Sequence, residues 1–589
     1  MPYDPATGIH TSPLPPAVLP TEPLSIFDFL FPAGKHLDDS RPCLIDSTSD
    51  RQYTRKQAHD RVLDLAKAFH SRGLRDKTCA VVFSPNDLEY GPCLWAAFRQ
   101  GGVVSPANPS YNASELAFQL QLVNKHYPVK LLVCHPESIV EAVKACEEVG
   151  FDSRLIVLIA APDSNNELAK GFPTLDQIVE TAKNNGLPPR VVLRQEEART
   201  KLALLSFSSG TTGLPKAVEI PHFAVIANSL QGASHWKATH PFRPYDPKQK
   251  TGDVAIACLP FYHIYGLIPV LHISVYLEMP LVILPKFTLP AFCDAITRFR
   301  ISILYVVPPM IIMLLKQDVS QYDLGSLRLV MSGAAPLTDE TVSAFRKKFP
   351  NAVCGQGYGM TESATLISLL DAGWKGGKGF PAASAGMLVP NIEAKIVSAE
   401  GKPLGPNEIG ELWSRGPSNA LGYLGNKKAT DETFDADRFL HTGDECKIDE
   451  DGLLYVVDRI KELIKANGFQ IAPAELEGHL LSHPDVADVA IIGIPDERRG
   501  EAPKGTTSLP LLSYVVPTTT WLSNKSRDHD ESHLVAALKK FVTDHKVKYK
   551  ALAEVEIVDL IPKTASGKLL RKDLRVRHAQ TVKDRSAKL

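Results

Sequence analysis

A short loop rich in hydroxyls and glycines constrains this chain more than any other stretch. It reads SFSSGTTGLPK at 206–216 and follows the apolar run LALL at 202–205, which predicts a buried strand. Glycines let the backbone come close to a ligand, and successive N–H groups in such a turn form an anion site. Because Lys216 adds a positive charge, the loop is suited to a polyanion such as a triphosphate. It lacks the G-x-x-x-x-G-K-[ST] pattern of a Walker A loop, and a flexible connector is the alternative interpretation.

Length and composition limit the class of protein. A chain of 589 residues is too long for one hydrophobic core, so we expect two or more domains. The net charge of −1 gives no electrostatic reason to bind nucleic acid or an anionic membrane. Nine cysteines without C-x-x-C spacing favour a reducing compartment. The N-terminus shows no secretory signal, and the apolar stretch 264–284 contains His272, Glu278 and two prolines, so we expect a buried segment and no transmembrane segment.

Apolar runs of strand length alternate with segments of helical spacing. The expected strands are 79–83, 103–104, 129–134, 202–205, 253–259, 282–287, 301–306, 327–331 and 486–494, and the expected helices are 53–73, 94–101, 114–123, 473–482 and 534–545. The first part of this series predicts βαβ units and a largely parallel sheet. Residues 1–23 are rich in proline and predict an irregular lead-in.

Further motifs follow the loop in the order typical of one family. SSGTTGLPK resembles the phosphate-binding signature of the adenylate-forming superfamily, which includes acyl-CoA synthetases, 4-coumarate–CoA ligases, beetle luciferases and peptide-synthetase adenylation domains. The other similar motifs are LPFYHIYG at 259–266, SGAAPL at 332–337, YGMTE at 358–362, GELWSRG at 410–416, TGD at 442–444 and PKTASGK at 562–568. The resemblance implies an α/β fold, with a large domain of layered βαβ subdomains plus a small barrel at 1–460. A small mobile α+β domain would follow at 461–589.

The resemblance also implies how ATP, Mg²⁺ and CoA would be bound. Tyr358 would face adenine, Asp444 would accept hydrogen bonds from the ribose hydroxyls, and Glu362 would offer a hard oxygen to Mg²⁺. Lys568, in a loop of small residues, would carry an ammonium to the α-phosphate. The implied catalytic residues are Lys568, Thr211, Glu362 and His263. The implied nucleotide- and CoA-binding residues are Ser208, Ser209, Gly210, Thr211, Thr212, Gly213, Lys216, Gln356, Gly357, Tyr358, Gly359, Thr361, Asp444, Arg459, Lys465, Gly468, Gln470 and Lys568.

An acyl pocket is implied beside the nucleotide. Its residues would be His263, Tyr265, Met331, Gly333 and Ala334. Plant 4-coumarate ligases usually carry Lys where this chain has Met331, and this departure favours a more apolar acyl tail. We therefore expect an aryl or medium-chain aliphatic acid, used in β-oxidation or in secondary metabolism.

The implied reaction is ATP-dependent ligation of a carboxylic acid to CoA. The carboxylate attacks ATP, pyrophosphate leaves, and the small domain then rotates about Lys461 so that CoA can attack the acyl-AMP. Three alternatives stay open: an enzyme that loads a carrier protein, a luciferase-like oxygenase and an inactive nucleotide-binding homologue. Because no carrier domain follows Lys568, free CoA is the favoured acceptor.

Three features near the C-terminus need separate interpretations. Residues 505–524 interrupt the resemblance where a hydrophobic strand is expected, and our hypothesis is an atypical insertion or an artefact such as a translated intron. The basic residues at 571–577 are interpreted as a solvated face. The final Ala587-Lys588-Leu589 is close to the peroxisomal S-K-L address. We therefore expect a peroxisomal import receptor as partner and a fungal-type peroxisomal acyl-CoA ligase, or otherwise a cytoplasmic one.

Overall fold

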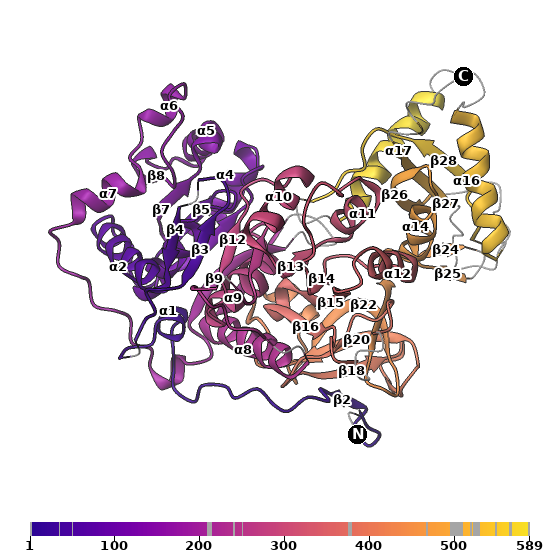
Figure 1. The fold of residues 1–589 in the computed structure, drawn as a ribbon, viewed down its shortest axis with the longest axis horizontal. Coiled ribbons are helices and arrows are strands. Elements are labelled where there is room, and N and C mark those ends of the chain that lie inside the picture. Colours follow the sequence, from indigo (N-terminus) through magenta and orange to yellow (C-terminus); the bar gives the residue numbers. More distant parts are fainter. Residues whose placement is uncertain are drawn as a thin grey trace.

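A large N-terminal part with three sheets and a small C-terminal part make up the protein (Figure 1). The structure is a computed structural model, which describes residues 3–34, 36–49, 51–208, 215–239, 242–249, 251–374, 380–466, 469–494, 511–518, 521, 531–547, 550–564 and 568–586. Helices cover sheets in the large part, and the small part lies at one end of it. This arrangement confirms the predicted α/β fold class.

The first sheet has the strand order β21-β10-β9-β6-β5-β7-β8. Its strands are β5 (Cys79–Phe83), β6 (Val103–Ala107), β7 (Val129–Cys134), β8 (Ile156–Leu158), β9 (Leu202–Ser208), β10 (Lys216–Pro221) and β21 (Gly422–Tyr423). The pairs from β9 to β8 are parallel, whereas β9–β10 and β10–β21 are antiparallel. The predicted strands 79–83 and 129–134 are confirmed at both ends, because strands buried on both faces are continuous apolar runs.

The second sheet has the order β17-β16-β15-β14-β13-β11-β12-β3-β4. Its strands are β3 (Pro42–Asp46), β4 (Gln52–Thr54), β11 (Ala255–Ala257), β12 (Leu281–Ile283), β13 (Ile303–Val306), β14 (Leu329–Ser332), β15 (Val353–Met360), β16 (Thr365–Leu369) and β17 (Met387–Leu388). Its centre, from β3 to the start of β15, is parallel, and the second half of β15 turns into an antiparallel pairing with β16. β15 therefore leads from the parallel sheet into the region where the sequence motifs cluster.

Helix α8 (His222–Thr239) lies between these two sheets, since it contacts β9 and β10 of the first and β16 of the second. A helix in this position must be buried on every side, and most of its residues are. Its polar side chains bind neighbouring backbone: Asn228 Nδ2 donates to Leu366 O at 2.9 Å and Gln231 Nε2 to Pro390 O at 2.8 Å. These bonds fix α8 to β16 of the second sheet and to the segment after β17.

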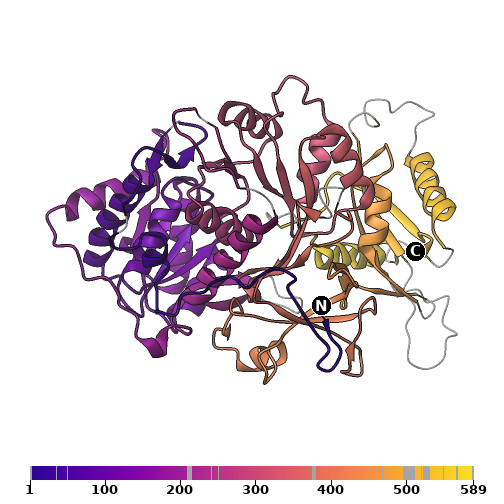
Figure 2. The same cartoon turned by 60° about the horizontal axis from the view of Figure 1, so that its bottom comes forward.

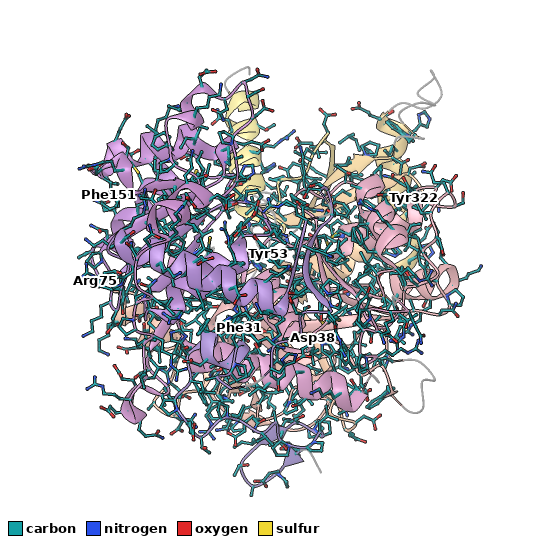
Figure 3. All side chains as sticks on the ribbon, turned by 60° about the vertical axis from the view of Figure 1, so that its left-hand side comes forward. Phe31, Asp38, Tyr53, Arg75, Phe151 and Tyr322 are labelled. Atoms are coloured by element: carbon teal, nitrogen blue, oxygen red, sulfur yellow. The ribbon has the colours of Figure 1, made fainter. Side chains whose placement is uncertain are left out.

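Other helices surround the sheets of the large part. They are α1 (Ile26–Leu30), α2 (Arg55–Ser71), α3 (Tyr90–Arg99), α4 (Ala113–Asn124), α5 (Ile139–Val149), α6 (Glu167–Lys170), α7 (Leu175–Ala182), α9 (Ile273–Tyr276), α10 (Leu289–Phe299), α11 (Pro308–Lys316), α12 (Asp339–Lys348) and α13 (Lys427–Thr433). Figure 3 shows Tyr53, just before α2, in the middle of this helical face. Its hydroxyl donates to the buried Glu89 at 2.5 Å, and Arg61 of α2 pairs with the same carboxylate at 2.9 Å. The buried negative charge of Glu89 therefore has a hydrogen-bond donor and an ion-pair partner where α2 meets α3.

The third sheet is antiparallel, with the order β1-β2-β18-β20-β22-β23 and β19 paired to β18 (Figure 2). Its strands are β1 (Tyr3–Asp4), β2 (Ile9–Thr11), β18 (Glu393–Val397), β19 (Pro403–Leu404), β20 (Gly410–Arg415), β22 (Leu440–Ile448) and β23 (Leu454–Arg459). It is the part of the large domain that corresponds to the predicted small barrel, and its strand order is that of an open sheet. The prediction of an irregular lead-in was wrong for β1 and β2, because strands this short leave no periodic pattern in the sequence.

The small part contains the three-stranded sheet β26 (Val486–Gly493), β27 (Leu511–Pro517) and β28 (Glu554–Ile557) and the hairpin β24 (Ile464–Ala466) and β25 (Phe469–Ile471). Helices α14 (Pro473–Leu481), α16 (Glu531–His545) and α17 (Arg571–Ser586) pack with it. Its buried apolar residues form two clusters that begin at Ile464 and are separate from those of the large part. The boundary at 460/461 remains a prediction, which these clusters fit.

Strand β27 changes the interpretation of residues 505–524. It is the central strand of its sheet, antiparallel to β26 and parallel to β28. Tyr514 and Val515 are fully buried in it. Residues 511–517 thus supply the strand that was expected after Lys504, and the hypothesis that part of 505–524 is an insertion or an artefact stays a prediction. The other residues of the segment, apart from Thr518 and Trp521, lie outside the described part of the chain.

Most cysteines and the apolar stretch 264–284 lie in the interior. All nine cysteines are free thiols, and eight of them are buried. The stretch 264–284 is buried as expected, and it includes a π-helical segment, η4 (Gly266–His272), with Pro269 inside it. Among the described residues, no helix has both the length and the apolar character needed to cross a membrane.

Candidate active site

The predicted site residues come from the ends of several strands. Met331 lies near the end of β14, and Gln356, Gly357, Tyr358 and Gly359 lie along β15. The single turn η5 (Thr361–Ser363) follows β15 and carries Thr361 and Glu362. In open α/β sheets, ligands bind in the crevice at the carboxyl ends of parallel strands, so this edge is the expected place for a site.

Three of the predicted nucleotide-binding residues form one bonded group. Asp444 on β22 and Arg459 on β23 face each other in the antiparallel pairing, with Arg459 Nε 3.0 Å from Asp444 Oδ1. The Tyr358 hydroxyl donates to Asp444 Oδ2 at 2.5 Å. Asp444 is only 2% exposed, and its negative charge raises the pKa of Arg459. A carboxylate has about four acceptor positions, so Asp444 retains capacity for the hydroxyls of a ribose.

A second group joins the first sheet to η5. The Tyr423 hydroxyl on β21 donates to Glu362 Oε1 at 2.8 Å, and Glu362 is 5% exposed. Lys216 Nζ lies 4.8 Å from the centre of the Tyr423 ring, a cation–π contact. Lys216 is paired with Ser208 across β9 and β10, so the two ends of the Ser/Gly/Thr loop meet beside Glu362.

Lys568 reaches this site from the small domain. Burial and the charge of Arg459 lower the pKa of Lys568, against the opposing effects of Glu462, Asp444 and Glu362. The Lys568 charge in turn acts on His263. Such mutual influences weaken with distance, so the Lys568 ammonium faces the same region as the predicted residues of the large domain.

His263 is a neutral side chain in this environment. Burial lowers its pKa to about 4, and the Lys568 charge acts in the same direction. The backbone N–H of Tyr265 donates to His263 Nδ1 at 3.3 Å. A neutral imidazole that accepts at Nδ1 carries its proton on Nε2, so His263 can donate a hydrogen bond to an anionic group.

The predicted acyl-pocket residues lie side by side. The Tyr265 hydroxyl donates to Met331 O at 3.1 Å. A Cβ placed on Gly333 would lie 3.0 Å from the Tyr265 ring, and one placed on Gly357 would lie 3.4 Å from Met331 Sδ. Ala334, in the turn after β14, has φ of +69°, a left-handed conformation that is uncommon for alanine. Because neither glycine has a side chain, Gly333 makes room for the Tyr265 ring and Gly357 makes room for the Met331 sulfur.

Two residues of β15 have structural roles that the motif did not reveal. A Cβ on Gly359 would lie 1.4 Å from Thr365 O, so the glycine is required by the β15–β16 hairpin itself. The Gln356 side chain binds backbone: its Oε1 accepts from Leu337 N at 2.7 Å and its Nε2 donates to Ala382 O at 2.8 Å. Gln356 thereby holds the turn after β14 against β15, and its polar atoms are already used.

Some predicted residues cannot be placed. Ser209, Gly210, Thr211, Thr212, Gly213 and Gly468 lie outside the described part of the chain. Lys465 and Gln470 are backbone partners in the β24–β25 hairpin. Their expected contacts with nucleotide and CoA stay predictions.

We compared the chain with models of known protein families. The family model described as AMP-binding enzyme matches residues 35–424, which is well over half of the chain. The chain belongs to the AMP-binding enzyme family. A second model, for the C-terminal domain of the same enzymes, matches residues 475–568. The predicted adenylate-forming superfamily is confirmed.

Individual relatives of this AMP-binding enzyme cover nearly its whole length. It is 34% identical to 4-coumarate–CoA ligase 2 of Oryza sativa subsp. japonica, with 98% of this chain and 96% of the relative aligned. It is also 34% identical to 4-coumarate–CoA ligase of Pinus taeda, with 92% of each aligned. In fold it is similar to the anthranilate–CoA ligase AuaEII with anthranoyl-AMP, at a TM-score of 0.79 and 22% identity, over 95% of this chain and 98% of that one. ATP-bound MatB from Rhodopseudomonas palustris gives a TM-score of 0.77 at 24% identity, over 94% and 98% of the two chains.

Sequence reasoning missed three residues of this AMP-binding enzyme's site. Tyr423 binds Glu362, and Glu462 acts electrostatically on Lys568. Arg571, interpreted as part of a solvated basic face, is 10% exposed and pairs with Glu477 at 2.7 Å and with Glu462. That interpretation was wrong for Arg571, because its acidic partners are 94 and 109 residues away in the sequence. A local charge pattern cannot show such pairs.

Among the described residues, the candidate ligand for Mg²⁺ is the single carboxylate of Glu362 and not a cluster of several protein ligands. Among them, no group of three or more His, Cys, Asp or Glu is arranged to hold a metal ion. Mg²⁺ usually binds through one or two carboxylates and the substrate phosphates, and Glu362 uses Oε1 for Tyr423. A single buried carboxylate beside the predicted phosphate-binding loop fits that mode.

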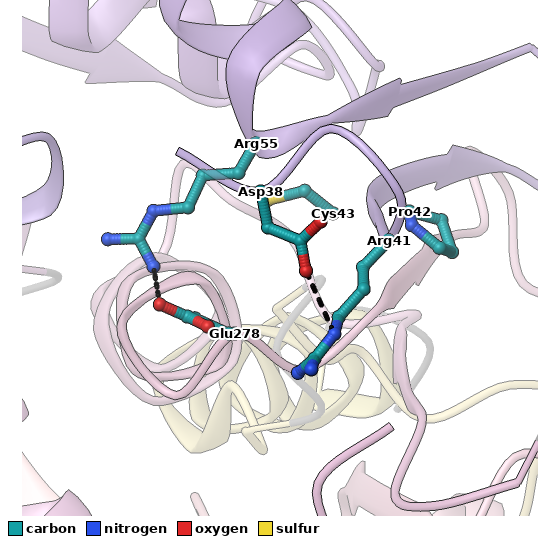
Figure 4. A pocket seen from close by; sticks show the side chains of 6 residues that line it. All are labelled: Asp38, Arg41, Pro42, Cys43, Arg55 and Glu278. Carbon is teal, nitrogen blue, oxygen red and sulfur yellow. Dashed lines mark hydrogen bonds and ion pairs between the residues drawn. The ribbon is translucent and has the colours of Figure 1, made fainter. Parts of the chain in front are cut away.

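A small pocket lies away from the site, between β3, α2 and α9 (Figure 4). Its lining residues are Asp38, Arg41, Pro42, Cys43, Arg55 and Glu278. Arg55 pairs with Glu278 at 2.8 Å, and Arg41 with Asp38 at 2.9 Å. A volume of about 10 Å³ has room for about one water molecule, so we assign this pocket no substrate.

Proposed function

We propose that this AMP-binding enzyme is an AMP-forming acid–CoA ligase. The observations that carry the proposal are the bonded group of Tyr358, Asp444 and Arg459 and the Glu362–Tyr423 pair in the large domain, with which Lys568 of the small domain interacts electrostatically. The relatives named 4-coumarate–CoA ligases, aligned over almost the whole chain, support the same reaction.

Acyl-AMP formation must bring two anions together. A carboxylate oxygen of the acid attacks the α-phosphorus of ATP, the bond to the bridging oxygen of the β-phosphate breaks, and pyrophosphate leaves with the electron pair. The Lys568 ammonium offsets the charge that grows at the α-phosphate, while Lys216 and the loop at 206–216 bind the leaving phosphates. Mg²⁺, when held by Glu362, would neutralise phosphate charge.

Asp444 and Arg459 would orient the nucleotide during this step, with Asp444 as acceptor for the ribose hydroxyls. His263 would donate from Nε2 toward the acid carboxylate, because its neutral ring accepts at Nδ1. In the second step the small domain would rotate about Lys461 and withdraw Lys568. The CoA sulfur then attacks the acyl carbon, the bond to AMP breaks, and the thiol proton passes to solvent.

The acid that fits best is aryl or medium-chain aliphatic. Met331 is 2% exposed beside Tyr265 and Gly357, so the proposed pocket presents apolar surface. The named relatives act on 4-coumarate, an aryl acid, and this supports the same range for the present chain. A role in secondary metabolism or β-oxidation is part of this proposal.

An acid panel tests the proposed reaction. ATP–pyrophosphate exchange is measured with 4-coumarate, benzoate, hexanoate and octanoate, followed by detection of CoA thioesters by mass spectrometry. We expect exchange that requires an acid, a thioester of the same acid, and loss of exchange in Lys568→Ala. Lys572→Ala, an exposed lysine on α17, is the matched control. No exchange with any acid, from a folded protein that binds ATP, would contradict the proposal and favour an inactive homologue.

Two other outcomes of these assays would assign the chain to a different class of enzyme. Exchange without a CoA thioester, but with acyl transfer to a phosphopantetheinyl carrier, would identify a carrier-loading enzyme. Light emission with a luciferin would identify an oxygenase.

Import into peroxisomes through Ala587-Lys588-Leu589 is also proposed. The tripeptide lies outside the described residues, and its similarity to S-K-L supports it. Fluorescence microscopy of an N-terminally tagged chain with and without these residues tests it. A cytoplasmic signal from both proteins would contradict the proposal.

A further inference from the structure

Lys316 makes a contact between the two domains that lies away from the reacting groups. It is the last residue of α11 in the large domain. Its ammonium donates to two backbone carbonyls of the small domain: Leu481 O at 3.4 Å and Val486 O. Leu481 ends α14 and Val486 begins β26, so one side chain binds both ends of the connection between them.

The end of α14 has unsatisfied acceptors that favour such a contact. The last carbonyls of a helix have no partner within the helix, and the helix dipole places partial negative charge there. A lysine ammonium is favourable near this end for both reasons. Lys316 therefore satisfies backbone groups of the small domain with a charge that belongs to the large domain.

Two further contacts keep α14 on the same surface. A Cβ on Gly478 of α14 would lie 2.1 Å from Thr338 Cγ2 at the start of α12, so the helix backbone approaches the large domain very closely. At the other end of α14, Ala474 N donates to Asp458 Oδ2 at 3.1 Å. Figure 1 shows α14 beside α12 and β26 beside α11. Contacts along its length thus hold α14 against α11, α12 and β23.

The same arrangement delivers Lys568. Arg571, three residues after Lys568, pairs with Glu477 of α14 at 2.7 Å. The Lys568 backbone N–H donates to Thr564 Oγ1 at 3.1 Å, and its carbonyl accepts from Thr564 N at 2.8 Å. The lysine-bearing loop is therefore tied to α14, and the position of α14 determines where the Lys568 ammonium lies.

We propose that Lys316 is a positioning residue for acyl-AMP formation, because it docks α14 in the one orientation that brings Lys568 to the site. The inference rests on the proposed function. When the small domain rotates for thioester formation, the two carbonyls must leave Lys316. Loss of the Lys316 contact therefore weakens the first step and leaves the second intact.

Separate assays of the two steps on the full chain test this. The variants are Lys316→Met, which keeps the aliphatic stem, Lys316→Arg, which keeps charge and donors, and Lys347→Met, which removes an exposed lysine from α12. Acyl-AMP formation is followed by pyrophosphate release with 4-coumarate or octanoate. Thioester formation is followed from synthetic acyl-AMP of the same acid and CoA, so that the second step does not depend on the first.

We expect Lys316→Met to slow acyl-AMP formation by about tenfold, the size of a charge-assisted hydrogen bond, with thioester formation unchanged or faster. Lys316→Arg should recover most of the rate, and Lys347→Met should match the wild type. Equal loss of both steps in Lys316→Met, or no loss in either, would overturn the inference while the wild-type activity stands. A wild type that forms no acyl-AMP would instead overturn the proposed function, and this inference with it.

Discussion

The large-domain and small-domain parts of the site are built differently. In the large domain, Asp444, Arg459, Tyr358 and Glu362 lie on paired strands or on the turn between them, and hydrogen bonds link them to one another or to Tyr423. In the small domain, one lysine is carried on a loop and placed by the docking of α14. The large-domain part of the site forms when that domain folds. The small-domain part is in place only when the small domain has the orientation that brings Lys568 to the site. Substitutions in the two parts should therefore have different signatures.

The largest expected effect on stability comes from the large-domain part. Asp444→Ala leaves the half-buried Arg459 guanidinium without its partner and removes the acceptor of the Tyr358 hydroxyl. Breaking a buried ion pair on one side costs about 3–5 kcal/mol, so we expect a loss of that order in the free energy of unfolding. Urea denaturation measures it. Asp444→Asn keeps an acceptor oxygen for Tyr358 but also removes the charge, so it should lose nearly as much; a much smaller loss would contradict the importance of the charge.

The next effect is on rate without a comparable loss of stability. Glu362→Gln keeps the volume and a hydrogen-bond acceptor for Tyr423 but removes the charge proposed to bind Mg²⁺. We expect acyl-AMP formation to fall roughly 10²–10³-fold, as when one transition-state contact is lost. Tyr423→Phe is the matched control, because it removes the hydroxyl and keeps the carboxylate. A Glu362→Gln enzyme with the wild-type rate and the wild-type Mg²⁺ dependence would contradict the role of Glu362.

Acid should weaken the large domain through buried neutral histidines. Burial lowers the pKa of His222 to about 3 and of His235 and His272 to about 4. Their unfolded-state pKa is about 6.5, so between about pH 6.5 and 4 the unfolded chain binds more protons and stability falls as pH falls. Each histidine contributes about 1.4 kcal/mol per pH unit within that window. Denaturant unfolding at pH 7.5, 6 and 5 measures the slope, and a flat or inverted slope would contradict these buried neutral states.

The smallest effect concerns the acyl pocket. Tyr265→Phe removes the hydrogen bond to Met331 O and keeps the ring against Gly333. A net loss of about 1 kcal/mol in stability is expected for one neutral hydrogen bond. The preference among acids should shift little, because the ring that shapes the pocket is retained. A large change of acid preference, measured on the same acid panel, would place the hydroxyl itself against the substrate.

Motifs and continuous apolar runs were predictable from the sequence. β5 and β7 were bounded correctly because their residues are buried on both faces. Asp444, Arg459 and Lys568 could be predicted as site residues because each belongs to an ordered motif. The strand β27 was not predicted because prolines and threonines surround it, although most of its own residues are apolar. Local pattern does not show that it completes a sheet.

Long-range pairs were not predictable. Tyr423 lies in a two-residue strand with no pattern of its own, and its importance follows only from contact with Glu362. Arg571 is in a run of basic residues. The carboxylates that pair with it belong to Glu477 of α14 and to Glu462, in the segment after β23. The docking contact of Lys316 is likewise a product of tertiary structure, since its acceptors are backbone carbonyls.

The most direct measurement is the rate of each step in Lys568→Ala at single turnover. Because the large-domain part is assembled without Lys568, the variant should bind ATP and the acid, form acyl-AMP roughly 10²–10³-fold more slowly, and convert synthetic acyl-AMP to the CoA thioester at nearly the wild-type rate. That result would show that the small domain supplies one charge to one step. Equal losses in both steps, or a wild-type rate of acyl-AMP formation, would contradict the account.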